Sequence, residues 1–341
     1  MKTKSVSLFL AVFFSLFIAS AYGSQDPKPQ DPKQAGDVKV SPDEMKALTA
    51  INATTDPPAK IKAISDYMKK FSKTPPQIRQ QLADISASEI AKIKDPAQAI
   101  AAAESVQPLF TTDAEQEPIL MSLLDTYVTA GRSDDAFRVG AAILAKNPEE
   151  VHTHAQLTFM AASEVKKQNP KFVKTGSQSA LKAIELIESD KKPARMDPAV
   201  WTSHKALLPQ IYQQSAVLSL VGENAAEARA RATKATQLAP NDPTNFALLG
   251  MVINNDYLAL ANSYKTMPEG ADKAATLKKL EGTIDEIIDA YAHAVALSVG
   301  KPEHQAMMQQ LTVDLTSYYK YRHNNSTDGL QALVDKYKPK P

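Results

Sequence analysis

The only histidines that lie close together in the chain are His152 and His154. Histidine side chains can ligate a metal ion or transfer a proton near neutral pH. Two residues apart on a helix, however, they project about 200° from each other, so they cannot hold one ion without ligands from elsewhere. We therefore expect no metal site here and interpret both as solvated residues of a helix.

Neighbouring carboxylates could perform general acid–base chemistry, which needs two carboxyl groups in different environments inside a cleft. Three such pairs are Asp134 with Asp135, Glu149 with Glu150, and Asp285 with Glu286. All lie at expected helix starts or on polar helix faces, where capping and solubility explain them. The motifs Gly-x-Gly-x-x-Gly, Gly-Lys-Ser/Thr in a phosphate loop, His-Glu-x-x-His and Gly-x-Ser-x-Gly are missing from the sequence. We expect neither an enzyme nor a cofactor.

The densest aromatic and basic cluster reads Tyr-Tyr-Lys-Tyr-Arg-His over 318–323. It could stack a sugar or a base, or hold a peptide. The interpretation that we favour is that Tyr318 and Tyr321, three residues apart, face the core while the cations stay in water. Trp201, the single tryptophan, is likewise interpreted as packing between repeats rather than as a ligand platform.

The N-terminal segment predicts export. Lys2 and Lys4 precede an apolar run over 8–18, and either Ala19-Ser20-Ala21 or Ala21-Tyr22-Gly23 supplies the small residues that a signal peptidase needs. The run is too short to span a membrane. We expect 1–23 to be a cleaved signal peptide, no integral membrane segment in the mature chain, and a periplasmic or secreted location. Because the sequence has no cysteine, we expect no lipid anchor on the new N-terminus.

The charge of the mature chain is close to zero. The sequence has 39 basic and 38 acidic residues, and removal of Lys2 and Lys4 turns its net charge of +1 into one net negative charge. This balance gives no electrostatic reason to expect nucleic acid as a partner. Residues 24–40 repeat the tetrapeptide Gln-Asp-Pro-Lys and are rich in proline and lysine, so we expect a disordered leader.

From residue 41 onwards, apolar residues recur at helical spacing, and no long stretch alternates as a strand does. A proline follows each of five residues that can cap a helix, namely Ser41, Asp56, Asp95, Asp197 and Asp242. The sequence thus predicts about seven helix pairs: 43–52 with 57–72, 77–93 with 96–107, 114–130 with 133–147, 150–168 with 174–189, 198–221 with 223–238, 243–266 with 271–299, and 303–321 with 327–337. The domain they form covers 41–341.

Two stretches carry apolar and small residues at the same eight offsets. One reads Leu120, Leu123, Leu124, Tyr127, Ala136, Gly140, Ile143, Pro148, and the other Tyr212, Ser215, Ala216, Ser219, Ala228, Ala232, Ala235, Pro240. A third copy of the opening half reads Phe246, Leu249, Gly250, Ile253. Large residues fill the space between repeats, and small ones allow two helices to cross closely. This spacing resembles the tetratricopeptide repeat, a helix-turn-helix unit of about 34 residues.

The resemblance implies an all-α solenoid whose first helices line a concave groove. It places in that groove Met121, Asp125, Val128, Thr129, Phe159, Met251, Asn254 and Asn255. Asn254 and Asn255 could each pair with a backbone amide, or they could be ordinary exposed helix residues. The implied function is a non-catalytic scaffold that binds a peptide or protein partner in envelope assembly or as an adaptor. The alternative is a helical-repeat protein that binds glycan or cell wall.

The sixth predicted pair is unusually long. A helix over 271–299 has about eight turns, whereas a tetratricopeptide helix needs about four. Its apolar seam consists of Leu277, Leu280, Ile284, Ile287, Tyr291 and Ala294. This seam either closes on the partner helix as a projecting hairpin or stays partly open as a docking edge.

Overall fold

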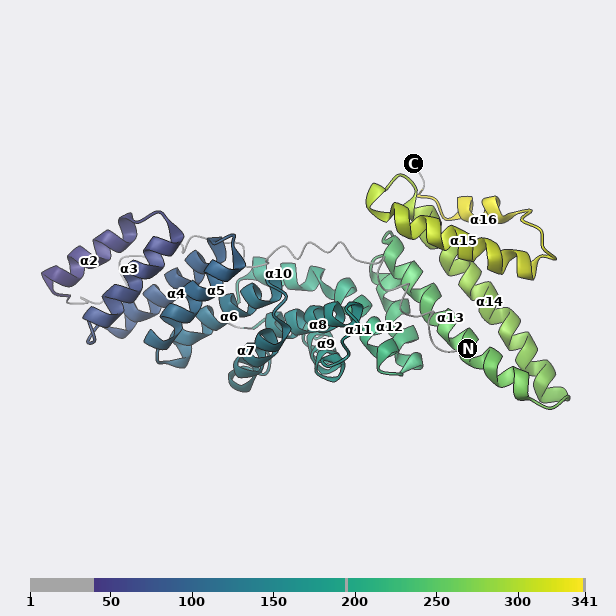
Figure 1. The fold of residues 1–341 in the computed structure, drawn as a ribbon, viewed down its shortest axis with the longest axis horizontal. Helices are drawn as coiled ribbons and strands as arrows, with labels where there is room; N and C mark the ends of the chain where they lie inside the picture. The colour runs from purple at the N-terminus through teal and green to yellow at the C-terminus, as the bar shows by residue number, and fades with distance from the viewer. Residues whose placement is uncertain (1–39, 194–195, 340–341) are drawn as a thin grey trace. The chain divides into compact units, whose positions relative to one another are not determined.

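The computed structural model describes residues 40–193 and 196–339, and in these ranges the regular structure is helical. The predicted signal peptide and nearly all of the predicted leader lie outside the described residues. The described chain divides into two compact units, which we call the N-terminal unit (40–160) and the C-terminal unit (161–339). Helix α8 (Val151–Lys166) crosses the boundary between them (Figure 1). No described helix is both long and apolar enough to cross a membrane.

The helices follow the predicted pairs closely. The N-terminal unit contains α2 (Pro42–Ala53), α3 (Pro57–Lys70), α4 (Pro76–Lys92), α5 (Pro96–Val106), the short 3₁₀ helix η2 (Gln107–Leu109), α6 (Asp113–Thr129) and α7 (Ser133–Lys146). The C-terminal unit contains α9 (Val173–Glu188), α10 (Pro198–Ala206), α11 (Leu208–Val221), α12 (Ala225–Leu238), α13 (Pro243–Thr266), α14 (Ala271–Ser298), η3 (Pro302–His304), α15 (Gln305–Arg322) and α16 (Leu330–Lys336).

Helices adjacent in the chain pack on each other, as a solenoid of helix pairs requires. Within pairs, contacts join α2 with α3, α4 with α5, α6 with α7, α11 with α12 and α13 with α14. Between pairs, the second helix of one pair contacts the first helix of the next, at α3–α4, α5–α6, α12–α13 and α14–α15. The fold is therefore all-α and tetratricopeptide-like. The last pair departs from this pattern, because α16 packs mainly on α14.

Local sequence sets the helix starts. The five predicted caps are confirmed, since the side chains of Ser41, Asp56, Asp95, Asp197 and Asp242 each accept a hydrogen bond from a backbone N–H of the first turn. Each is followed by a proline, whose missing N–H costs nothing at this position. The prediction of one helix over 198–221 was wrong. Pro209 cannot donate the ladder hydrogen bond, and the helix breaks at Leu207 into α10 and α11.

Small residues lie where helices cross, as the repeat spacing predicts. Ala136, Ala228, Ala232 and Ala235 are fully buried. A Cβ atom at Gly140 would lie 2.9 Å from both methyl carbons of Leu157 on α8. Larger side chains would separate these helices. Among the other packing residues, Leu123 and Tyr127 are buried. The residues that open the three repeats are half-buried, namely Leu120, Tyr212 and Phe246, and Leu249 is half-buried as well.

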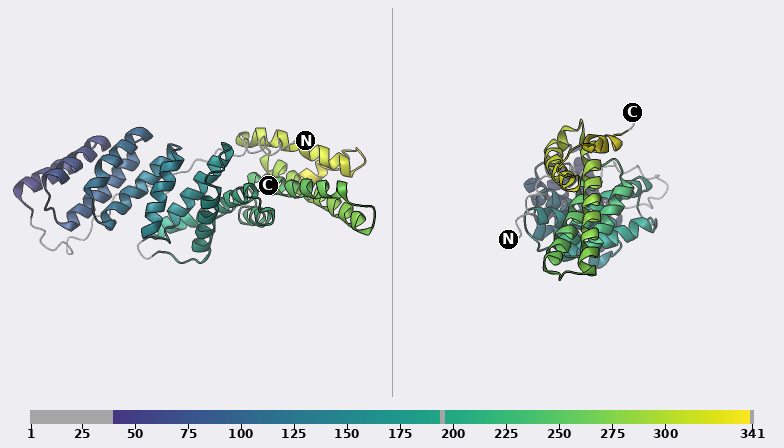
Figure 2. Two further views of the ribbon diagram at one scale, coloured as in Figure 1. Left: turned by 60° about the horizontal axis from the view of Figure 1, so that its bottom comes forward. Right: turned by 90° about the vertical axis from the view of Figure 1, so that its right-hand side faces the viewer.

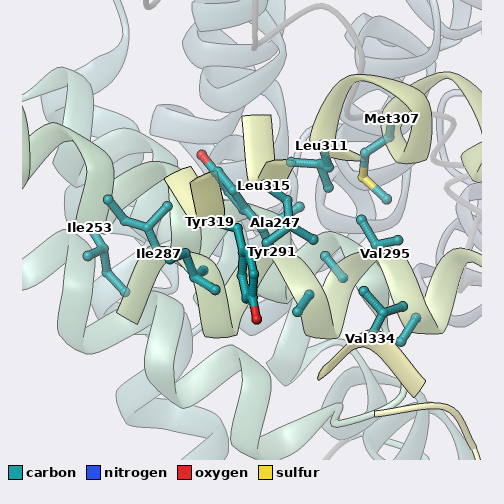
Figure 3. Close-up of a cluster of buried hydrophobic side chains, with 14 of the residues drawn as sticks. Ala247, Ile253, Ile287, Tyr291, Val295, Met307, Leu311, Leu315, Tyr319 and Val334 are labelled. Carbon is teal, nitrogen blue, oxygen red and sulfur yellow. The ribbon is translucent and has the colours of Figure 1, made fainter. Parts of the chain in front are cut away.

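The core of the C-terminal unit forms around α14. The views in Figures 1 and 2 show α13 and α14 as a long antiparallel hairpin with α15 laid across α14. The seam of α14 is buried from Leu280 to Ala294, and Leu277 is 38% exposed. Its buried part contacts α13, α15 and α16, with Ile253, Leu315 and Val334 among the partners (Figure 3). The buried part of the seam is therefore covered by three helices of the unit and not by α13 alone. The start of the seam, at Leu277, remains partly exposed to solvent.

Candidate functional site

A polar cluster lies between α6 and α8 in the N-terminal unit. The Nε2 atom of His152 is 2.6 Å from Oδ1 of Asp125, and the side-chain amide of Gln156 donates to the same oxygen at 2.9 Å. All three come from the first helices of consecutive pairs. The structure thus brings the predicted groove residue Asp125 together with two residues that the sequence pattern did not select.

The prediction that His152 and His154 are solvated was wrong, because they are 2% and 8% exposed. Burial by itself lowers the pKa of His152, but the charges of Asp125 and then Glu150 outweigh it and raise this pKa above its usual value. The two rings diverge as the helical spacing predicts, and Nε2 of His154 lies 3.0 Å from the carbonyl oxygen of Pro148. Within the described residues, no group of three or more potential ligands could hold a metal ion.

The carboxylate pairs serve as caps and in ion pairs. Glu150 is buried at the start of α8 and accepts hydrogen bonds from the backbone N–H groups of His152 and Thr153. Asp135, at the start of α7, forms ion pairs with Arg132 and Arg138. Asp285 and Glu286 on α14 form ion pairs with Arg322 and Arg229. Glu150 therefore caps a helix as expected, whereas Asp135, Asp285 and Glu286 form ion pairs instead.

The other groove candidates of the N-terminal unit divide into packed and accessible ones. Met121 and Phe159 are 7% and 8% exposed, and the hydroxyl of Thr153 donates to the Met121 sulfur at 3.5 Å. Val128 is half-buried and Thr129 is exposed. Met121 and Phe159 therefore pack as core residues in this structure, while the last turn of α6 is open to a ligand.

In the C-terminal unit, Met251, Asn254 and Asn255 are all half-buried on α13. The hydroxyl of Tyr318 donates to Oδ1 of Asn254 at 2.6 Å, which links the first helices α13 and α15. Among the described residues, the amide nitrogen of Asn254 and the whole amide group of Asn255 have no hydrogen-bond partner. These groups lie beside the apolar Met251 side chain and can pair with the backbone of another chain.

The aromatic cluster on α15 is oriented differently from the prediction. Tyr319 is buried at 6% exposure, whereas Tyr321 is 66% exposed. The buried face of α15 runs through Met307, Leu311, Leu315 and Tyr319 in steps of four, so Tyr321 falls on the opposite side. Tyr318 is half-buried at the edge, with its ring 6.3 Å from that of Tyr257 and perpendicular to it. Only one of the two tyrosines predicted to face inward therefore contributes to packing.

Trp201 on α10 is 6% exposed, as expected of a packing residue. Its indole N–H donates to Oδ1 of Asp190 at 3.2 Å. The hydrogen bond satisfies the one polar group of a buried tryptophan.

A pocket of about 410 Å³ lies between α12, α13 and α14, entirely within the C-terminal unit. Its apolar wall is formed by Phe246, Leu249, Ile253 and Ala290, and its polar lining by Arg229, Thr233, Asp285, Glu286 and Asp289. Sequence reasoning missed this pocket. Three of its residues follow a helical spacing on α13, but Arg229 contacts Glu286 across 57 residues of chain, and only the fold brings such a pair together.

Stacked rings support the wall of this pocket. The Phe246 ring stacks on the His293 ring with centroids 3.7 Å apart, and the His293 ring stacks on that of Tyr337 at 4.3 Å. Burial lowers the pKa of His293 below its usual value, which favours the neutral imidazole. The Tyr337 hydroxyl donates to Oδ1 of Asp289. Tyr337, the residue that follows α16, thereby supports both an aromatic wall and a carboxylate of the pocket.

Comparisons with known proteins give only distant structural similarities. No family model and no curated protein matches the chain. TTC0263, a thermophilic TPR protein of Thermus thermophilus, is 14% identical, with a TM-score of 0.34 over 70% of this chain and 98% of that one. The C-terminal part of a TPR repeat-containing protein from Cytophaga hutchinsonii is 12% identical, with a TM-score of 0.41 over 86% and 92%. A monomeric IFIT1 mutant solved with m7Gppp-AAAA is 13% identical, with a TM-score of 0.39 over 82% of this chain and 56% of that one.

Proposed function

We propose that the protein is an exported, non-catalytic scaffold that binds an extended peptide segment of a protein partner along α13. The observation that carries this proposal is the half-buried group formed by Met251, Asn254 and Asn255. Within the described residues, the Asn254 amide nitrogen and the Asn255 amide have no hydrogen-bond partner, and both lie one helical turn from the apolar Met251 side chain. A peptide backbone offers alternating donors and acceptors, which such amides can satisfy.

The helix pairing supports the choice of this face. In repeats of this type the first helix of each pair is available to a ligand, while the second packs behind it. The Tyr318 hydroxyl of α15 holds the Asn254 side chain in place by a hydrogen bond to its Oδ1 atom. The Asn254 nitrogen is therefore oriented before a ligand arrives, which lowers the entropy cost of binding.

A photo-cross-linking experiment tests the binding surface. A photoreactive amino acid is placed at position 255, and a matched variant carries it at Gln237, which is exposed on α12. Irradiation of whole cells should give a discrete protein adduct from position 255 and none from position 237. Asn255→Ala should reduce the amount of the same partner recovered by affinity purification. Equal labelling from both positions would contradict the proposal.

Export is the second part of the proposal and is tested separately. The basic residues and the apolar run of 1–23 support removal of a signal peptide after Ala21 or Gly23. N-terminal sequencing of the protein from the envelope fraction should give one of these two ends. An intact Met1 would contradict export and leave the binding proposal unaffected.

A further inference from the structure

We propose that the pocket between α12, α13 and α14 binds a lysine or arginine side chain of the protein partner. This inference rests on the proposed function, because it assumes a protein ligand, but it concerns a different surface from Met251 and Asn255. It identifies the partner by its chemistry, namely a basic residue with an apolar stem.

The first argument is charge. Asp285, Glu286 and Asp289 line the pocket together with a single cation, Arg229. The guanidinium of Arg322 neutralises Asp285 from outside through two hydrogen bonds of 2.7 and 3.0 Å. Three carboxylates against two guanidinium groups leave one negative charge.

A wider circle of neighbours does not change this balance. Asp256 lies 3.6 Å from Arg229 and Glu281 lies 3.8 Å from Arg322, and each adds a negative charge. Lys336, whose ammonium donates to the Tyr337 hydroxyl at 3.0 Å, and Lys279, whose charge acts on Asp256, each add a positive one. The excess therefore remains a single negative charge, and a monovalent cation is the complementary ligand.

The second argument is the position of Asp289. Its carboxylate accepts a hydrogen bond from Tyr337. Among the described residues no cation lies within ion-pairing distance of it, and Lys336 acts on it only from further away. The hydroxyl occupies one oxygen and leaves acceptor capacity for a ligand. A carboxylate that is oriented by a neighbour but not neutralised can pair with an incoming ammonium or guanidinium group.

The third argument is the apolar wall. Phe246 and Leu249 are half-buried, so part of each is open to the pocket. Lysine and arginine carry methylene stems that pack on apolar surface while the charged head stays at a polar edge. The aromatic ring also attracts a cation at its face. An anionic or purely apolar side chain would use only one of these two features.

The experiment measures binding of simple probe peptides to the full mature protein. The probes are acetylated and amidated heptapeptides of glycine and alanine with one central lysine, norleucine or glutamate. Isotope labelling of isoleucine methyl groups makes Ile253 a local reporter, with Ile64 of the N-terminal unit as the internal reference. The lysine peptide should shift the Ile253 methyl resonance, leave Ile64 unchanged, and bind at least about fivefold more tightly than the other two.

Two substitutions test the role of the carboxylate. Asp289→Asn should weaken binding of the lysine peptide by about fivefold or more. The substitution removes the one carboxylate charge of the pocket that is not in an ion pair with Arg229 or Arg322. Asp66→Asn is the matched control, since Asp66 is an exposed carboxylate on α3 in the other unit. It should leave the affinity unchanged. Circular dichroism melts of both variants confirm that each is folded.

Three outcomes would overturn the inference. Equal affinity for norleucine and lysine would show a purely apolar pocket, and an unchanged affinity of Asp289→Asn would remove the carboxylate from the site. Binding of cadaverine as tight as that of the lysine peptide would identify a small-amine site instead of a partner site. Cross-linking from position 255 tests the proposed function independently. A partner found there without lysine binding here would leave that function standing and defeat this inference alone.

Discussion

Gly250 of α13 lies directly against the ring of Tyr291 of α14. A Cβ atom at position 250 would lie 2.3 Å from Cε1 and 2.4 Å from Cδ1 of that ring. Tyr291 is 1% exposed and is surrounded by the core of the C-terminal unit, so the ring cannot move aside easily (Figure 3). The close contact between α13 and α14 at this point therefore depends on the absence of a side chain at Gly250.

Gly250→Ala should destabilise the protein by about 1–3 kcal/mol, because it overpacks this contact. The matched control is Gly282→Ala on α14, where a Cβ atom would meet nothing within 4 Å. In a helix interior this change should stabilise the protein by up to about 1 kcal/mol. Urea denaturation of both variants measures the two effects, and destabilisation of equal size in both would contradict the packing described.

Ala232→Leu should likewise cost about 1–3 kcal/mol of unfolding free energy. Ala232 is fully buried on α12, which contacts both α11 and α13. Lys234→Ala on the same helix is the control, since it removes only a partly exposed side chain whose ion pair with Glu188 measures 4.0 Å. Thermal and urea melts should show a clear loss for the first variant and little change for the second. The repeat register would be wrong if both losses were small.

The stability of the N-terminal unit should fall steeply with acid because of Glu115. Arg79 of α4 donates two hydrogen bonds to its carboxylate at 2.8 and 2.9 Å, and the backbone N–H of Thr111 donates a third at 2.9 Å. Arg79 first, and then the backbone donors, lower the pKa of Glu115 from 4.5 to about 2 despite its burial.

Because the pKa of Glu115 is lowered in the folded state, its contribution is complete above pH 4.5 and is lost as the pH falls towards 2. The contribution is at most about 3 kcal/mol. Glu115→Gln should therefore destabilise the protein at pH 7 and flatten its loss of stability between pH 5 and pH 3. Glu117→Gln, at an exposed position of the same helix, is the control. Parallel pH profiles for the wild type and Glu115→Gln would refute this prediction.

The seam of α14 offers two positions with opposite expectations. Ile284→Ser should cost about 2–5 kcal/mol, because it opens a cavity and buries a hydroxyl in the apolar core. Ile284 is 1% exposed, whereas Leu277, two turns earlier on the same seam, is 38% exposed. Leu277→Ser should change the unfolding free energy by less than about 1 kcal/mol. Equal losses in urea melts would mean that the first turns of α14 are covered in solution.

Much of the fold follows from the sequence alone, because helix starts depend on neighbours within one turn. A cap and the N–H that it binds lie two or three residues apart, as for Asp56 with Ala59, so the sequence shows both partners. The same holds for the alanines of α12, whose spacing already indicates a face too crowded for larger side chains. Pro209 also acts locally, because a proline inside a helical pattern interrupts the ladder of hydrogen bonds and separates α10 from α11.

What the sequence could not determine is which face of a helix is covered and by what. A spacing of three places Tyr318 and Tyr321 on one side, but the position of α14 decides that Tyr319 is buried and Tyr321 exposed. The burial of His152 and the pocket beside Phe246 depend in the same way on side chains from other helices. The burial of a side chain and the charge around it both depend on many neighbours that are distant in the chain. Only tertiary packing brought Asp125 to His152, and Arg229 to Glu286.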